Sequence, residues 1–87
     1  MEKRMNAGYE IINAIKIGEG EIVLAQNEKA PSRYVTWECF NGDSYNWGHY
    51  SDDLLTAQKD FLERGLKKVR FCEQNRPKQH KKTEPER

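Results

Sequence analysis

The chain has 87 residues, of which 36% are hydrophobic and 33% are charged, and its formal net charge at pH 7 is +1. This length allows one domain and is near the size at which a single core is marginal, so a partner or a second copy would help it. No stretch approaches the about 18 consecutive apolar residues of a membrane span, and the start lacks the apolar region of a secretory signal. We therefore expect a cytoplasmic protein without membrane contact, in which Cys39 and Cys72 are free thiols.

Charge is distributed unevenly along the chain. Residues 1–66 carry seven Lys and Arg against eleven Asp and Glu, whereas residues 67–87 carry eight against three. The segment 75–87 contains no aliphatic or aromatic side chain and has two prolines, so it cannot offset the entropy cost of ordering. We predict one domain over residues 1–74, followed by a disordered basic tail over 75–87.

The first predicted element is a β-hairpin. Two runs rich in β-branched residues, 9–17 and 21–26, flank Gly18-Glu19-Gly20. A two-residue loop at Gly18 and Glu19 places Ile17 opposite Gly20 and Ile15 opposite Ile22. Strand alternation then puts four apolar residues on one face. They are Ile11, Ile15, Ile22 and Leu24.

A second hairpin is predicted from residues 33–40 and the turn signal Asn41-Gly42. A loop of odd length, at residues 40–42, places Trp37 opposite Tyr45 and Val35 opposite Trp47. With this parity both tryptophans point to the same side as the isoleucines of the first hairpin. The sequence therefore predicts one shared aliphatic and aromatic core.

An amphipathic helix is predicted over residues 52–72, with Ser51 as its N-cap. Six apolar residues recur at helical spacing and are expected to face the sheet. They are Leu54, Leu55, Phe61, Leu62, Leu66 and Val69. Gly65 leaves an alternative open, because it could end the helix and make residues 66–72 a fifth strand.

Together these elements predict an α+β fold, with an antiparallel meander of about four strands and one C-terminal helix packed on one face. A single helix leaves the other face of the sheet apolar and bare, unless the N-terminal segment covers part of it. We predict that this face binds a protein partner or a second copy in a homodimer. The candidate interaction residues are Ile12, Val23, Tyr34 and Phe40.

No residue pattern indicates catalysis, a cofactor, a metal or a small-molecule substrate. In the predicted register His49 lies about 20 Å from Cys39 along the strands, too far for a Cys-His pair. The cysteines and histidines form no close ligand pairs of the kind that zinc sites use. We therefore expect a non-catalytic protein.

Nucleic-acid binding is the alternative function. The predicted third and fourth strands are crowded with aromatic residues, like the stacking surfaces of sheet-based RNA-binding proteins. Residues 33–50 contain one basic residue, however, against Glu38 and Asp43, so these aromatic residues lack a cationic surround. The candidate contacts are in the basic C-terminal part: Lys67, Lys68, Arg70, Lys78, Lys81 and Lys82.

The central block carries a family resemblance. Its motifs are Tyr34-Val-Thr-Trp-Glu-Cys, Asn41-Gly-Asp-Ser-Tyr and Trp47-Gly-His-Tyr, followed by Asp53-Leu, Ala57, Asp60 and Arg64. With Gly8-Tyr-Glu-Ile-Ile and Ile17-Gly, this pattern resembles small uncharacterised proteins encoded on integrative conjugative elements of Gram-positive gut bacteria. The resemblance implies an accessory or regulatory protein of a mobile element, of the kind that binds and blocks a host factor such as restriction or CRISPR machinery.

Overall fold

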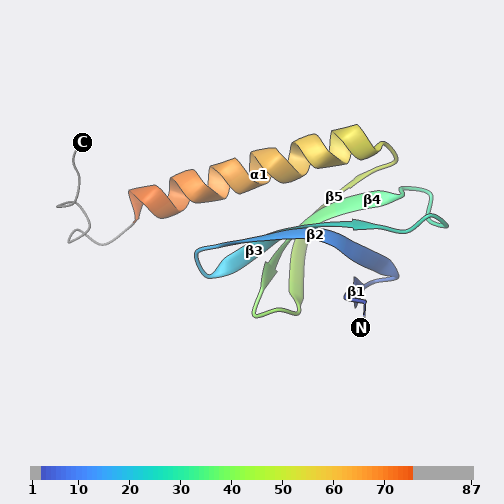
Figure 1. The fold of residues 1–87 in the computed structure, drawn as a ribbon, viewed down its shortest axis with the longest axis horizontal. Coiled ribbons are helices and arrows are strands. Elements are labelled where there is room, and N and C mark those ends of the chain that lie inside the picture. The colour runs from blue at the N-terminus through green and yellow to red at the C-terminus, as the bar shows by residue number, and fades with distance from the viewer. Residues whose placement is uncertain (1–2, 76–87) are drawn as a thin grey trace.

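The structure is a computed structural model that describes residues 3–75, so the predicted tail lies outside the described residues apart from Asn75. Five antiparallel strands form one sheet in the order β1-β2-β3-β4-β5, and one helix follows them (Figure 1). The elements are β1 (Met5–Asn6), β2 (Tyr9–Ile17), β3 (Gly20–Gln26), β4 (Tyr34–Phe40), β5 (Ser44–Ser51) and α1 (Leu54–Gln74). The predicted α+β meander with a C-terminal helix is confirmed, with five strands in place of about four.

The hairpin of β2 and β3 has the predicted loop. Ile17 pairs with Gly20 and Ile15 with Ile22, and Gly18 has the positive φ of 62° that this tight turn requires. A β-bulge between Ile11 and Asn13 shifts the register further along β2. Because a bulge reverses side-chain parity, Ile11 leaves the face of Ile22 and packs on the opposite side, so its predicted placement was wrong.

The hairpin of β4 and β5 also has a three-residue loop, but at residues 41–43. Phe40 pairs with Ser44 and Cys39 with Tyr45, two positions from the predicted register and with the same parity. A second register shift, opposite Trp37, places Trp47 at a backbone φ of +53°. The residues of β5 before and after this shift therefore follow different alternation, and the sequence pattern alone does not reveal the change.

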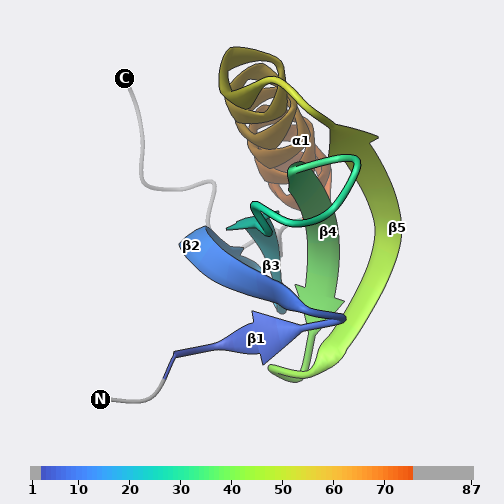
Figure 2. The same ribbon diagram turned by 90° about the vertical axis from the view of Figure 1, so that its right-hand side faces the viewer.

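The sheet curls, so that each face has a core of its own (Figure 2). We call the side covered by α1 the helix face and the opposite side the far face. The helix-face core consists of Ile17, Ile22, Leu24, Ala57 and Phe61. The far-face core consists of Tyr9, Val23, Ala25, Val35, Trp37 and Cys39.

The two tryptophans lie on opposite faces, against the prediction. Trp37 is only 4% exposed and packs its ring against Tyr45 on the far face, with ring centroids 5.4 Å apart. Trp47 is 64% exposed and meets Phe40 edge-on, with centroids 6.2 Å apart. The bulge in β5 is the physical cause, because it turns Trp47 away from the side that alternation predicts.

Helix α1 is continuous through Gly65, so the alternative of a fifth strand at 66–72 was wrong. Its N-cap is Asp53, not Ser51: the Asp53 carboxylate accepts the backbone N–H of Thr56 at 2.9 Å. The Thr56 hydroxyl also donates to this carboxylate at 2.7 Å, and the two hydrogen bonds, the hydroxyl's first, hold the Asp53 pKa below its ordinary value. Of the predicted apolar stripe only Phe61 is buried; the helix rests on the sheet through a narrow line of Ala57, Phe61 and Gly65.

Candidate functional site

The predicted bare face does not exist, because its four residues do not share a face. Val23 is 0% exposed within the far-face core. Tyr34 packs on the helix-face core, and the ring of Phe40 contacts Trp47 on that same side. Ile12 is 41% exposed at the bulge in β2. The interaction surface predicted from alternation was therefore wrong.

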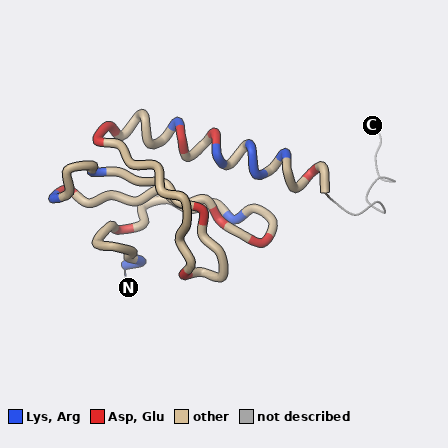
Figure 3. Tube along the Cα trace, turned by 180° about the vertical axis from the view of Figure 1, so that it is seen from behind, with Lys and Arg blue, Asp and Glu red and all other residues tan. Residues whose placement is uncertain are grey.

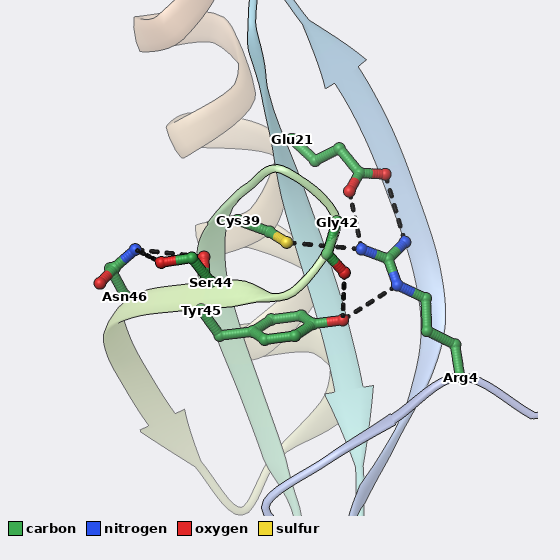
Figure 4. Close-up of polar contacts among 7 residues, drawn as sticks. All are labelled: Arg4, Glu21, Cys39, Gly42, Ser44, Tyr45 and Asn46. Atoms are coloured by element: carbon green, nitrogen blue, oxygen red, sulfur yellow. Dashed lines mark hydrogen bonds and ion pairs between the residues drawn. The ribbon is translucent and has the colours of Figure 1, made fainter.

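The far face is instead covered by the N-terminal segment and by the curl of the sheet. The rings of Tyr9 on β2 and Tyr50 on β5, two strands that are not neighbours in the sheet, lie 6.1 Å apart. Arg4 reaches across the same face (Figure 4). Its Nη2 and Nη1 donate to the Glu21 carboxylate at 2.7 and 3.2 Å, and its Nε donates to the Tyr45 hydroxyl at 3.0 Å.

Arg4 therefore acts as a clamp that ties the segment before β1 to β3 and β5. The hydrogen bonds from Arg4 hold the pKa of the Glu21 carboxyl below its ordinary value, and those to Glu21 raise the Arg4 pKa. The guanidinium also lies 3.5 Å from the Cys39 sulfur, which is almost fully buried. Because the donors of Arg4 are occupied by the protein itself, we assign this cluster a structural role.

One flank of α1 carries several of the most exposed large apolar side chains in the described part of the chain. Leu62 is 67% exposed and Leu66 is 51% exposed, although the sequence predicted both as core. We define the leucine surface by its five members: Leu54, Leu55, Leu62, Leu66 and Val69. Exposed apolar area of this extent on one side of a helix is unusual for a monomer.

Beside the leucine surface lies an open strand edge. β1 pairs only with Tyr9 and Glu10, so residues 13–17 of β2 have no strand partner on their outer side within residues 3–75. Ile15, on this stretch, is 46% exposed. An open edge of this kind is a template for another strand.

The opposite flank of α1 forms a groove with β4 and β5. The groove has a volume of about 450 Å³. Seven residues line it: Glu38, Trp47, His49, Arg64, Lys67, Lys68 and Phe71. It therefore combines two exposed aromatic rings with three basic side chains and one acidic side chain.

A partly buried polar network supports the floor of this groove. Thr36 is 0% exposed, and its hydroxyl donates to the Asp60 carboxylate and accepts from Arg64 Nη1 at 3.0 Å. Arg64 also donates to the Thr36 carbonyl at 3.1 Å. His49 Nδ1 lies 3.0 Å from the same Asp60 carboxylate. This network was not predicted from the sequence, in which its one signal is the opposite charges of Asp60 and Arg64 at i, i+4 spacing.

Of the predicted nucleic-acid contacts, Lys67 and Lys68 line the groove, whereas Arg70 is exposed elsewhere on the helix. Lys78, Lys81 and Lys82 lie outside the described residues. Figure 3 shows the basic residues gathered along the second half of α1. Thus the structure brings two of the six candidates together with aromatic rings.

Both cysteines are free thiols, with Cys39 in the far-face core and Cys72 against the helix-face core. Across residues 3–75, no three His, Cys, Asp or Glu side chains group closely enough to hold a metal ion. In the same part of the chain, no helix has the length and apolar character needed to cross a membrane. Comparisons with protein-family models, curated proteins and solved structures give no match to this chain.

Proposed function

We propose that the protein is a non-catalytic protein-interaction module that works as a homodimer, joined through the leucine surface and the open edge of β2. The observation that carries this proposal is the exposure of Leu62 and Leu66 beside that edge. The exposed Ile15 on the β2 edge adds to the apolar surface that a second copy could cover.

The strand edge favours a second copy as the partner. An antiparallel strand can pair with its own copy across a two-fold axis, and two-fold dimers are the commonest oligomers. Residues 13–17 are paired to β3 without a register shift, so no bulge interrupts the edge to which a strand would pair. The outer edge of β5, by contrast, is interrupted by the bulge at Trp47, which disfavours pairing there.

Charges beside the leucine surface are also self-complementary. Lys59 and Glu73 stand seven residues before and after Leu66, and Glu63 and Arg70 stand three before and four after. In two antiparallel helices that cross at Leu66, Lys59 of one copy faces Glu73 of the other. Glu63 faces Arg70 in the same way, so all four cross-contacts join opposite charges.

A non-catalytic role is supported by the burial of the nucleophiles. The Thr36 hydroxyl is fully buried and engaged by Asp60 and Arg64, and Cys39 is 1% exposed. Cys39 also lies on the opposite face of the sheet from His49. A regulatory role on a mobile element, with a host factor as target, stays the prediction that the resemblance makes.

Sedimentation or light scattering over a range of concentrations tests the dimer. We expect L66D to raise the dimer dissociation constant by at least about 100-fold, because it places a charge near the two-fold axis in each copy, where the dimer would bury Leu66. F71D is the matched control, because Phe71 is 59% exposed on the same helix but lines the groove. A wild-type chain that stays monomeric at high micromolar concentration would overturn the proposal.

A charge exchange tests the geometry more sharply. The variants K59E and E73K each place like charges opposite one another in their own homodimers, so each should dimerise less well. Mixing the two variants restores opposite charges at both contacts, so the mixture should form a heterodimer more tightly than either variant self-associates. A mixture no tighter than the single variants would contradict the antiparallel arrangement.

A further inference from the structure

Trp47 is held in a conformation that folding alone does not explain. Its φ of +53° lies in the left-handed region, which is costly for a bulky side chain. This strain yields no burial, because the ring is 64% exposed and touches Phe40 only edge-to-face. The bulge in β5 therefore presents an aromatic surface to solvent at the mouth of the groove.

The cations of the groove stand close to this ring. Lys68 Nζ lies 5.2 Å from the centre of the Phe40 ring and 5.9 Å from that of Phe71. Its nearest acidic partner, Glu38, is at 4.0 Å, a long contact that leaves other donors of the ammonium group available. Lys67 is exposed along the same wall. Arg64 is turned toward Thr36 and Asp60, so Lys67 and Lys68 are the two cations of the groove that remain for a ligand.

The remaining polar group of the groove has a fixed orientation. His49 Nδ1 is engaged with Asp60 at 3.0 Å, and the His49 side chain is 57% exposed. This contact fixes the ring and leaves Nε2 as the nitrogen available to a ligand. Asp60 is in turn held by Thr36, so the position of His49 depends on the partly buried network.

We propose that this groove binds a nucleotide unit, with the base stacked on Trp47 and the phosphate held by Lys67 and Lys68. Exposed aromatic rings bordered by cations are the arrangement with which proteins bind unpaired nucleotides. The volume of about 450 Å³ is in the range of small-ligand sites. The nucleotide comes either from a single strand or from a free mononucleotide, and the same chemistry recognises both.

The proposed nucleotide site is separate from the proposed dimer interface, because it lies on the other flank of α1. The leucine surface and the groove share no residue, so the proposed dimer leaves both grooves open. Binding of nucleotide and self-association can therefore be tested independently on the full chain.

The test titrates the full-length protein with two probes, a fluorescein-labelled ten-residue oligothymidylate and thymidine monophosphate. Binding of the first is followed by fluorescence anisotropy, and binding of either by the NMR signals of the two indole N–H groups. We expect the Trp47 signal to shift and the buried Trp37 signal to stay. Raising KCl from 50 to 200 mM should weaken oligonucleotide binding about sevenfold if two phosphates are contacted.

Variants separate the groove from general charge attraction. W47A should weaken binding about 10-fold, because it removes the stacking of one base on an aromatic ring. W47F should restore most of the affinity, because it keeps an aromatic ring at this position. K67E should weaken binding more than K29E, which makes the same charge change in the β3–β4 loop. Binding of the oligonucleotide alone identifies a single strand as the source, whereas binding of both probes identifies the nucleotide unit.

Two results would overturn the proposal. One is binding that W47A leaves unchanged, which would assign the affinity to the basic residues outside the groove. The other is no shift of the Trp47 signal with either probe at millimolar concentration.

Discussion

The two faces of the sheet are closed by different means. The far face is filled by its own strands: Tyr9, Trp37 and Tyr45 pack edge-to-face, and Arg4 holds the N-terminal segment against them. The helix face is closed by a separate element that touches it through a narrow line of residues. The far face is thus closely filled, whereas the loosely covered helix face leaves apolar and charged groups exposed.

The largest difference between the two faces is expected when one tryptophan from each region is truncated. We expect W37A to lower the free energy of unfolding by about 3–5 kcal/mol, because a large ring is removed from a filled core. W47A should change it by no more than about 0.5 kcal/mol, as for other exposed positions. Urea denaturation followed by circular dichroism measures both, and W37F serves where W37A does not fold. Equal losses at the two positions would contradict the assignment of the faces.

A smaller effect is expected from adding one methyl group on each face. In G48A the new Cβ would lie 2.9 Å from Trp37 Nε1 and 2.8 Å from the Tyr50 ring, so we expect a loss of about 1–3 kcal/mol. In G65A it would lie 3.8 Å from Ile17 Cδ1, an ordinary contact, and alanine favours the helix by about 0.5–1 kcal/mol. Thermal unfolding of the pair should show opposite signs. A stabilising G48A would show that the far face is loosely packed.

The smallest effect concerns the clamp at Arg4. The folded-state pKa of Glu21 is lowered, so its contribution to stability is present above the unfolded-state pKa of about 4.3 and is lost as the pH falls through the folded-state value. We expect E21Q to cost about 0.2–1 kcal/mol near pH 7, as for a partly exposed ion pair, and progressively less as the pH falls below the unfolded-state pKa. Unfolding curves of both proteins across this range measure the difference. A cost independent of pH would exclude the ion pair as its source.

Local features were predictable where a single residue type imposes the geometry. Gly18 allows the positive φ of the β2–β3 turn, and Ile15 and Ile22 pair as expected. The odd loop between β4 and β5 also followed from the sequence, because only that parity puts Trp37 and Tyr45 on one side. The helix was predictable in extent, since its apolar spacing continues through Gly65.

The candidate sites were less predictable, because they depend on two bulges and on the rotation of the helix. A bulge inserts one residue that no alternation pattern marks, and the bulge at Trp47 decides that this ring borders the groove. Two rows of residues at helical spacing could have faced the sheet: one contains Leu62 and Leu66, and the other contains Ala57, Phe61 and Gly65. The larger side chains of the first row suggested that Leu62 and Leu66 would be buried. The row with Gly65 is buried instead, because small residues allow the helix to approach the sheet closely.

The order of the elements, the chain reversals and the α+β class could be predicted from local backbone preferences and from spacing along the chain. The side that each residue faces beyond the bulges, the curl of the sheet over its far face and the side of α1 that is exposed could not. These features depend on contacts between residues far apart in sequence, such as Arg4 with Tyr45 and Thr36 with Asp60.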